Sequence, residues 1–305
     1  MTATPAAGAA RPGRLDVGIV GVGRVGSVLG AALSRAGHRL VGACAVSRDS
    51  RRRAAQLLPG TPLLPADEVV GRSALVLLTV PDDALPDLVE GLATTESFPA
   101  GQLVAHTSGR YGMAVLEPAQ RRGALPLAVH PVMTFVGSSV DLQRLVGASF
   151  GVTAPEHLLP VAEALVIEMG GEPVRIAEEL RPLYHAALAG GANHVVTLVA
   201  QTADLLRSAG VAEPGRMLSP LLGAALDNAL RSGDAALTGP VARGDAAGVA
   251  AHLAELRRTA PAAVAPYVAL ARLTADRALA AGRLDPTAAE ALLGVLATPA
   301  DEARA

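Results

Sequence analysis

Short apolar runs alternate with amphipathic stretches along the first half of the chain. The runs are rich in Val, Leu and Ile, and Gly or Pro separates most of them from helical patterns, so they are typical of buried strands. The predicted strands are Leu15–Val20, Arg39–Val46, Ala74–Val80, Gln102–His106, Leu125–His130, Ala148–Val152 and Glu172–Ile176. The predicted helices between them are Arg24–Ala36, Asp49–Leu58, Met113–Arg122 and Pro155–Met169. This alternation predicts an α/β domain with a mostly parallel sheet and helices on both faces.

The pattern changes after Ile176, where strand signals largely disappear. Helical periodicity predicts Glu178–Ala209, Pro214–Ser232, Asp245–Arg258, Pro266–Ala281 and Pro286–Leu296, although Gly190 and Gly191 weaken the first of these helices. We therefore expect an α/β domain over residues 14–176 and an all-α domain over residues 177–300. Residues 1–13, mainly Ala, Pro, Gly and Thr, are expected to form a disordered tail rather than a signal peptide.

A glycine motif joins the first predicted strand to the first predicted helix. Gly21, Gly23 and Gly26 follow the spacing G-x-G-x-x-G directly after Leu15–Val20. In this context the first glycine permits a tight turn, the second lets the backbone approach a pyrophosphate, and the third lets the helix pack close to the strand. The helix start favours an anion as well. The motif predicts a Rossmann-like dinucleotide-binding domain.

The residues after the second predicted strand indicate which dinucleotide fits. An acidic residue there would hold the ribose 2′-hydroxyl of NAD. Ser47 and Arg48 stand there instead, with Arg52 as a weaker candidate, and a hydroxyl with guanidinium groups suits a 2′-phosphate. Asp49 is expected to cap the next helix. The sequence thus favours NADP(H) over NAD, the alternative being that these arginines form a solvated helix face. The predicted cofactor-binding residues are Gly21, Gly23, Arg24, Val25, Gly26, Ser47, Arg48, Val80 and Pro81.

Polar residues also follow two other predicted strands. His106 and Ser108 end one strand and His130 ends another, and parallel strands share their carboxyl edge, so we expect them near the nicotinamide. His106 is a candidate substrate contact there. On the long helix His185 and Asn193 are eight residues apart and share a broad face. His185 is a candidate proton donor, and Asn193 a partner for a carbonyl or carboxylate. Each histidine is as readily explained by a structural role.

A loop between two predicted helices, Thr238–Asp245, carries an unusual Thr-Gly-Pro sequence. Arg243 is a candidate ligand for an anionic substrate, and Thr238 a further substrate contact. Asp245 is explained simply as the cap of the following helix.

Composition narrows the function classes. A formal net charge of −2 gives no indication of a nucleic-acid partner, and no apolar run is long enough to span a membrane. The one cysteine, Cys44, excludes an intramolecular disulfide and suits a reducing cytoplasm. All 26 basic residues are arginine, so lysine chemistry is excluded. The scattered histidines do not suggest a metal site.

These segments together resemble a family that joins a Rossmann-like NADP-binding domain to a domain of unknown function, DUF2520. The resemblance covers about residues 15–275 and rests on the glycine motif, Val80–Asp83, His106–Gly109, His130–Phe135, Tyr184–Asn193 and Leu237–Asp245, the last being the most specific. The family is similar to pyrroline-5-carboxylate reductase, 6-phosphogluconate dehydrogenase and deazaflavin-dependent NADP reductases. This implies a homodimer built through the helical domains, with the site between domains. A family lysine just before the Tyr-His pair is replaced here by Arg181 or a neighbour, so His185 becomes the candidate proton donor.

The sequence leads to three hypotheses. The leading one is an NADPH-dependent reductase of a small carbonyl or imine compound that bears a carboxylate, with ketopantoate as the named candidate. In it His185 or His130 supplies the proton, Asn193 and Ser108 orient the substrate, and Arg243 pairs with the carboxylate. The alternatives are a non-catalytic NADP-binding sensor or regulatory protein, and a reductase of another cofactor such as a deazaflavin.

Overall fold

The structure, a computed structural model, describes residues 13–297. The expected tail of residues 1–13 lies, except for Gly13, outside the described residues. The chain divides into two compact units, Met1–Gly191 and Ala192–Ala305. The division falls inside one long helix, α8 (Arg181–Ser208), whereas the sequence places the domain boundary at Ile176, where the last strand signal ends.

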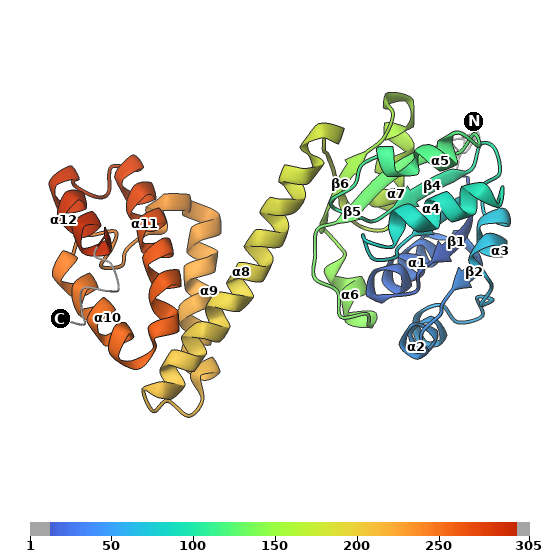
Figure 1. The fold of residues 1–305 in the computed structure, drawn as a ribbon. Coiled ribbons are helices and arrows are strands. Elements are labelled where there is room, and N and C mark those ends of the chain that lie inside the picture. Colours follow the sequence, from blue (N-terminus) through green and yellow to red (C-terminus); the bar gives the residue numbers. More distant parts are fainter. Residues whose placement is uncertain (1–12, 298–305) are drawn as a thin grey trace, which may run out of the picture. The chain divides into compact units, whose positions relative to one another are not determined.

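Within the described residues of the first unit, seven strands form a single sheet (Figure 1). They are β1 Asp16–Val20, β2 Arg39–Cys44, β3 Leu75–Leu78, β4 Leu103–His106, β5 Leu125–Pro131, β6 Ser149–Thr153 and β7 Glu172–Arg175. Their order across the sheet is β2-β1-β3-β4-β5-β6-β7. Strands β1 to β5 are parallel, β6 is antiparallel to β5, and β7 is parallel to β6. The carboxyl ends of β1 to β5 therefore share one edge, where ligands bind in open α/β sheets.

Helices connect these strands and cover both faces of the sheet. They are α1 Arg24–Ala36, α2 Arg48–Leu57, α3 Ala66–Gly71, α4 Leu85–Thr94, α5 Glu117–Gln120, α6 Ser139–Arg144 and α7 Leu159–Glu168, with 3-10 turns η1 Ala114–Leu116, η2 Glu156–Leu158 and η3 Glu178–Leu180. The α/β fold expected from the sequence is confirmed. Helices α3, α4 and α6 were not predicted, because two of them are only six residues long and α4 follows a Pro-Asp-Asp turn directly.

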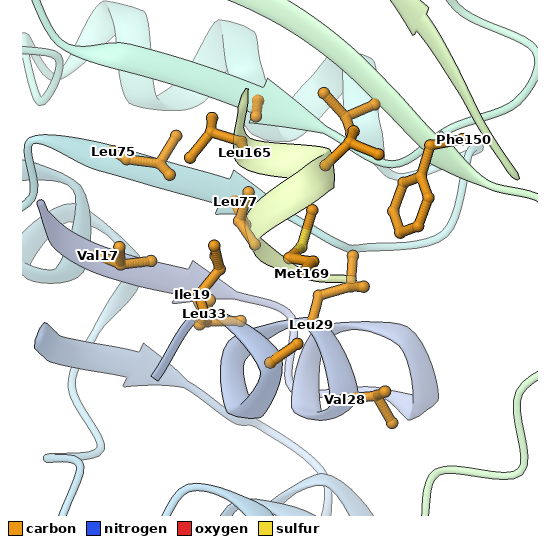
Figure 2. Packing of buried hydrophobic residues seen from close by; sticks show 14 of the residues in the cluster. Val17, Ile19, Val28, Leu29, Leu33, Leu75, Leu77, Phe150, Leu165 and Met169 are labelled. Carbon is orange, nitrogen blue, oxygen red and sulfur yellow. The ribbon is translucent and has the colours of Figure 1, made fainter. Parts of the chain in front are cut away.

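The core lies in two layers, one on each face of the sheet. Successive side chains of a strand point to opposite faces. Ile19 and Leu77 pack with α1 and α7 in one cluster (Figure 2), whereas Val20 and Val76 pack with α3, α4 and α5 in the other. Burial of both faces explains why the strands are continuous apolar runs rather than alternating ones.

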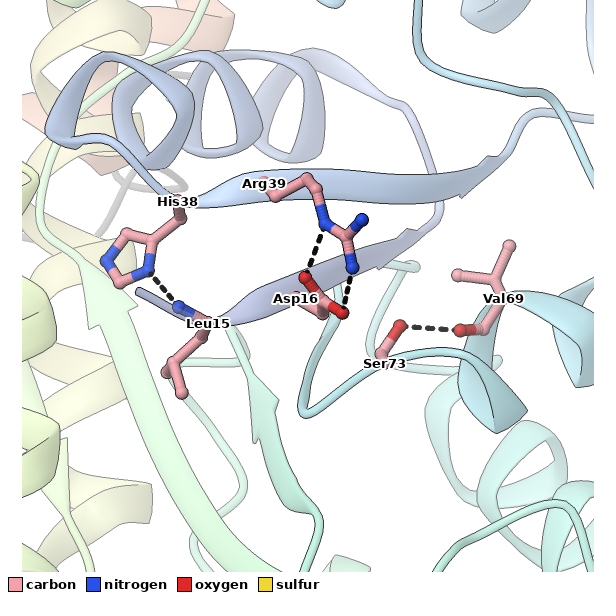
Figure 3. A network of polar contacts seen from close by, with 6 residues as sticks. All are labelled: Leu15, Asp16, His38, Arg39, Val69 and Ser73. Carbon is pink, nitrogen blue, oxygen red and sulfur yellow. Dashed lines mark hydrogen bonds and ion pairs between the residues drawn. The ribbon is translucent and has the colours of Figure 1, made fainter. Parts of the chain in front are cut away.

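A polar network fixes the amino ends of β1 and β2, away from the ligand-binding edge (Figure 3). The backbone N–H of Leu15 donates to His38 Nδ1 at 3.1 Å, and His38 Nε2 lies 2.8 Å from a carboxylate oxygen of Glu168. Asp16 and Arg39 form an ion pair between the two strands. These contacts orient the strand that leads into the glycine motif.

The second unit is helical throughout its described residues. Besides the second part of α8 it contains α9 Pro214–Ser232, η4 Gly233–Ala236, α10 Ala246–Thr259, η5 Pro261–Ala263, α11 Val264–Ala280 and α12 Pro286–Ala297. Its core is an apolar cluster shared by α10, α11 and α12, with Leu253, Ala275 and Leu292 at its centre. No helix between residues 13 and 297 combines the length and apolar character needed to cross a membrane.

Candidate functional site

The glycine turn between β1 and α1 has the geometry that each of its glycines requires. Gly21 has φ +100°, and a Cβ there would lie 2.9 Å from the Thr79 carbonyl carbon. A Cβ on Gly26 would overlap the Thr79 hydroxyl and the Gly21 carbonyl, so only glycine lets α1 start this close to the sheet. Gly23 is the N-cap of α1, and a Cβ there would meet no atom within 4 Å. Of the three glycines in the motif, only Gly23 therefore leaves its backbone open to a ligand.

The side chains around this turn are basic or apolar. Arg24 is exposed, Val25 is half-buried, and no acidic residue lies in the first turn of α1. Gly137, at the end of the loop after β5, sits between Arg24 and Arg53: a Cβ there would lie 3.1 Å from Arg24 Cγ and 2.9 Å from Arg53 Nε. Two guanidinium-bearing side chains thus approach the helix start, whose unpaired N–H groups already favour an anion.

Strand β2 ends beside a second positive region at the start of α2. The N-cap of α2 is Ser47, whose hydroxyl accepts from the Ser50 backbone N–H at 3.0 Å. The expectation that Asp49 caps this helix is therefore wrong. Asp49 lies one position inside the helix and forms an ion pair with Arg52 at 3.0 Å. Arg48 is exposed and has no ion pair among the described residues.

A pocket of about 450 Å³ opens next to the end of β2. Its lining is mainly apolar and comprises Cys44, Ala45, Val46, Arg51, Leu63, Leu64 and Pro65. Val46 is 82% exposed and Leu63 is 46% exposed, which is unusual for aliphatic side chains in a folded domain. The region offers an apolar hollow next to Ser47 and Arg48 in the chain.

Val80 and Pro81 follow β3 at the same edge. Val80 is half-buried, and its Cγ1 would lie 3.0 Å from a Cβ on Gly21; Pro81 is exposed. Thr79, just before them, donates its hydroxyl to the Gly21 carbonyl at 2.6 Å. These residues hold the glycine turn from the side of β3, and the contact of the Thr79 hydroxyl with this turn was not predicted from the sequence.

His106 and Ser108 follow β4 and are both buried. The Ser108 backbone N–H donates to His106 Nδ1 at 3.2 Å, so the ring proton is on Nε2, which donates to the Gly112 carbonyl at 2.7 Å. Burial lowers the pKa of His106 to about 4, and the nearby Arg181 charge adds to this effect. Both ring nitrogens of His106 are thus used inside the protein. The Ser108 hydroxyl accepts from the backbone N–H groups of Arg110 and Tyr111 at 3.1 Å and keeps its own proton to donate.

His130, at the end of β5, meets the start of α8. Its Nδ1 lies 2.8 Å from the hydroxyl of Tyr184, and the two rings are edge-to-face. The His185 ring is also edge-to-face with His130, with 6.5 Å between ring centroids. Gly109 lies against both histidines, since a Cβ there would be 2.9 Å from His130 Nε2 and 2.9 Å from His185 Cδ2. The structure thus brings together the predicted residues His130 and His185, with Gly109 and Tyr184 beside them.

Arg181 lies behind this histidine pair and is fully buried. Its guanidinium donates to four oxygens, those of Thr153 Oγ1 (2.8 Å) and the carbonyls of Ser108 (3.1 Å), Ala128 (3.1 Å) and Gly151 (2.9 Å). None of these acceptors is a carboxylate, so the charge is held by neutral dipoles. Together with burial it lowers the pKa of His130 to about 4, burial being the larger cause and His185 contributing as well.

The remaining predicted site residues belong to the second unit. Asn193 follows Gly191 in α8, and Thr238 and Arg243 lie in the loop before α10. Arg243 donates to the Thr238 carbonyl at 2.6 Å, which closes the loop on itself. Asp245 caps α10 by accepting from the Gly248 N–H at 2.8 Å, as the sequence predicts.

No group of three or more His, Cys, Asp or Glu side chains in residues 13–297 could hold a metal ion. Sequence reasoning named Gly109, Tyr184 and Arg181 within its motifs but assigned none of them a contact with His130. Tyr184 was noted only as a neighbour of His185, and its partner His130 is 54 positions away in the chain. The one available signal was the spacing of Arg181 and Tyr184, which lie one turn apart at the start of the long helix.

Two domain models match the chain. A Rossmann-like domain matches residues 1–131, and the domain of unknown function DUF2520 matches residues 148–274. No curated protein matches the chain.

Several solved structures share the fold. The Bacteroides fragilis protein BF3122, described as a candidate NADP oxidoreductase, is 23% identical and has a TM-score of 0.72 over 86% of this chain and 98% of its own. Protein TM1727 from Thermotoga maritima is 22% identical, with a TM-score of 0.64 over 87% and 98%. A 1-pyrroline-5-carboxylate reductase from Streptococcus pyogenes is 17% identical, with a TM-score of 0.57 over 87% and 98%. The TM-scores show that these proteins share the fold of this chain, and at such low sequence identity the comparison shows the fold alone.

Proposed function

We propose that this chain, which belongs to the proteins that join a Rossmann-like domain to a DUF2520 domain, is an NADPH-dependent reductase of a small carbonyl or imine compound that bears a carboxylate. One observation carries the proposal: an open glycine turn and a pair of histidines lie at the same edge of one sheet. Strands β1 and β5 are three positions apart, or about 14 Å at the usual strand spacing. An extended dinucleotide with its phosphates at Gly23 reaches that far along the edge.

The residues around the glycine turn fit NADP(H). The open space at Gly23 and the unpaired N–H groups of α1 suit a pyrophosphate, with Arg24 as a counter-charge. Arg48 and the N-terminus of α2 suit a 2′-phosphate, and no carboxylate at the end of β2 competes for a ribose diol. The Ser47 hydroxyl already bonds Ser50, so we assign the 2′-phosphate mainly to Arg48. The apolar pocket at Val46 and Leu63 suits the adenine ring.

When bound, NADPH supplies the hydride that reduces the substrate carbon. This chain supplies the groups that hold the substrate and deliver a proton. His130 and His185 stand on either side of Gly109, and Ser108 retains a hydroxyl proton that can bind a substrate oxygen. His106 we assign a supporting role, because it is buried and positions the Ser108 backbone. The roles of Asn193 in orienting the substrate, of Thr238 as a contact and of Arg243 in pairing with a carboxylate stay predictions from the sequence.

Ketopantoate is the substrate we name first, because a 2-oxo acid of this kind presents both the carbonyl and the carboxylate that the predicted site residues suit. Two proteins that share the fold, the candidate NADP oxidoreductase and the 1-pyrroline-5-carboxylate reductase, support a reductase that uses NADPH on a C=O or C=N group. The single cysteine suits a reducing compartment, and we place the reaction in the cytoplasm.

The second unit supports a homodimer. Arg181 is the one buried residue in the 28-residue helix α8, and large aliphatic side chains of α8 and α9 are exposed: Val195, Val196, Leu198, Val199, Met217, Leu221, Leu226 and Leu230. An apolar surface of this extent is rare on monomers. We propose that a second copy of the chain covers it, so light scattering should give about twice the chain mass of 30.7 kDa. Leu221→Glu should shift the protein toward the monomer.

Substrate reduction is tested with the purified protein, NADPH, and a panel of 2-oxo acids that includes ketopantoate. We expect NADPH oxidation with at least one of them, and its loss in His185→Ala and Asn193→Ala with NADPH affinity retained. His157→Ala is the matched control, since His157 is exposed and remote in sequence from these segments. Saturable NADPH binding with no oxidation of NADPH by any of the panel would contradict the proposal and indicate a sensor.

A further inference from the structure

We propose that Tyr184 is a positioning residue which fixes the tautomer of His130 and replaces the proton that His130 gives to the substrate. The inference rests on the proposed reductase function for its chemical step, but its structural part, the position of the His130 ring proton, stands independently. The sequence favours His185 as the proton donor. The inference assigns this role to His130 instead.

The direction of the hydrogen bond between Tyr184 and His130 follows from the acid–base character of the two groups. The Tyr184 hydroxyl lies 2.8 Å from His130 Nδ1. A phenol is a stronger hydrogen-bond donor than a neutral imidazole N–H, and an imidazole nitrogen is a stronger acceptor than a phenol oxygen. The hydroxyl proton therefore goes to His130 Nδ1.

Glycine at position 151 is required for this arrangement. A Cβ there would lie 2.7 Å from Tyr184 Cζ and nearer still to the hydroxyl oxygen. Gly151 and His130 are also paired across the antiparallel strands β5 and β6. The absence of a side chain at position 151 thus leaves room for the Tyr184 hydroxyl beside His130.

With Nδ1 as acceptor, the single proton of a neutral His130 is on Nε2. Nε2 is on the edge of the ring away from Tyr184, next to the Cα of Gly109 and facing the His185 side. Gly109 has no side chain to fill this space. The N–H of His130 is therefore presented at the carboxyl edge of the sheet, where the proposed substrate would bind.

His130 carries one ring proton at neutral pH, since burial, Arg181 and His185 hold its pKa down at about 4. A neutral imidazole that gave up its last proton would become a strongly basic anion. Donation from Nε2 therefore requires that Nδ1 gain a proton at the same time. The Tyr184 hydroxyl is the donor in place at Nδ1.

The substrate carbon gains the hydride, the C=O electron pair moves to oxygen, and this oxygen takes the proton from His130 Nε2. His130 Nδ1 takes the Tyr184 proton at the same time. Water then returns a proton to Nε2 and Nδ1 returns its proton to the phenolate, so the starting tautomer is restored and one proton is consumed overall.

The surroundings of Tyr184 act in both directions on its phenolate. Burial raises the pKa of Tyr184 and opposes the phenolate, more strongly than the Arg181 guanidinium, 5.7 Å from the ring centroid, stabilises it. The phenolate is therefore formed only during turnover and is not a resting state.

The structural part is tested by NMR of protein labelled with ¹⁵N in histidine, without cofactor. The two-bond ¹H–¹⁵N correlations report which ring nitrogen carries the proton, and the signals that disappear in His130→Gln identify this residue. We expect protonated Nε2 and unprotonated Nδ1 in the wild type, and a mixture of tautomers in Tyr184→Phe. Protonated Nδ1 in the wild type, or an unchanged tautomer in Tyr184→Phe, would overturn the inference.

Tyr267→Phe is the matched control. Tyr267 makes the same kind of contact with a histidine, since its hydroxyl lies 2.9 Å from His252 Nδ1, but in the second unit and at an exposed histidine. This variant should leave the His130 signals unchanged. It also controls for the general loss of a Tyr–His hydrogen bond.

The chemical part is tested with a substrate that the wild type reduces. Tyr184→Phe should lower kcat by about 10- to 100-fold, the range of one acid–base contribution, with the NADPH affinity within a factor of about two since no contact with the cofactor is assigned to Tyr184. The solvent isotope effect should fit two protons in the wild type and one in the variant. If no 2-oxo acid is reduced, the proposed function fails while the NMR result still decides the tautomer. An unchanged kcat in Tyr184→Phe would instead overturn the relay alone.

Discussion

The guanidinium of Arg181 donates a hydrogen bond to the Gly151 carbonyl at 2.9 Å, and so ties the first turn of α8 to the interior of the sheet. The same side chain bonds to the β5 backbone at Ala128 and to the loop after β4 at Ser108. One buried cation thus joins the segments that carry His130, Ser108 and Tyr184. The geometry of the histidine site depends on a residue that no substrate touches.

Replacing Arg181 with Met should destabilise the protein. The substitution removes the Arg181 donor from four buried oxygens, and charged hydrogen bonds of this kind contribute more than neutral ones, so we expect the free energy of unfolding to fall by about 3 kcal/mol. Urea denaturation at neutral pH measures this change. The control Arg72→Met removes an exposed ion pair with Glu68 and should cost less than about 1 kcal/mol. Equal effects of the two substitutions would contradict the role assigned to Arg181.

His106 should make the protein sensitive to mild acid. The pKa of His106 is about 4 in the folded protein against an ordinary value of 6.5. Above pH 6.5 the ring is neutral in both states and the pH has no effect; as the pH falls from 6.5 toward 4, the unfolded state takes up a proton that the folded state refuses, and stability is lost. The full loss is about 3 kcal/mol for this residue.

The variant His106→Gln tests this expectation, because the amide can still donate to the Gly112 carbonyl but does not titrate. The free energy of unfolding is measured at pH 7.5 and at pH 4.5. Between these two conditions it should fall by about 2 kcal/mol more in the wild type than in the variant. The same pH dependence in both proteins would show that His106 is not the buried neutral histidine described above.

Arg48 should determine the preference for NADPH over NADH. It lies in the first turn of α2 beside the cap Ser47 and has no acidic partner among the described residues, so its guanidinium is available for a 2′-phosphate. Arg48→Ala should raise the Kd of NADPH by about tenfold and leave that of NADH unchanged, as measured by fluorescence titration. Arg52→Ala is the control, since Arg52 already pairs with Asp49. Equal weakening of both cofactors by Arg48→Ala would speak against a 2′-phosphate contact.

The glycine turn could be predicted from sequence because its requirements are local. Gly21 needs a positive φ, and Gly26 needs the absence of a Cβ beside Thr79, and both follow from the strand–turn–helix pattern. The cap of α2 was assigned to Asp49 instead of Ser47, since either residue type suits an N-cap and a shift of two positions is invisible in the pattern. Helix α8 runs through Gly190 and Gly191 although these residues weaken helical propensity.

The sequence does not show which histidine has a structural role and which faces the site. His106 and His130 both end parallel strands, so the pattern predicts the same role for both. The loop after β4 folds over His106 and uses both of its ring nitrogens, while the start of α8 leaves one edge of His130 free at Gly109. That difference arises from contacts between residues far apart in the chain, such as Tyr184 with His130, which no local pattern encodes.

Transfer of deuterium from 4-deuterated NADPH to a 2-oxo acid, followed by mass spectrometry of the product, tests the central claim most directly. A reductase with the site described here should place one deuterium on the carbinol carbon of ketopantoate or of another 2-oxo acid, and His130→Gln should abolish this transfer while it still binds NADPH. Saturable NADPH binding by the wild type without deuterium in any product would contradict the account.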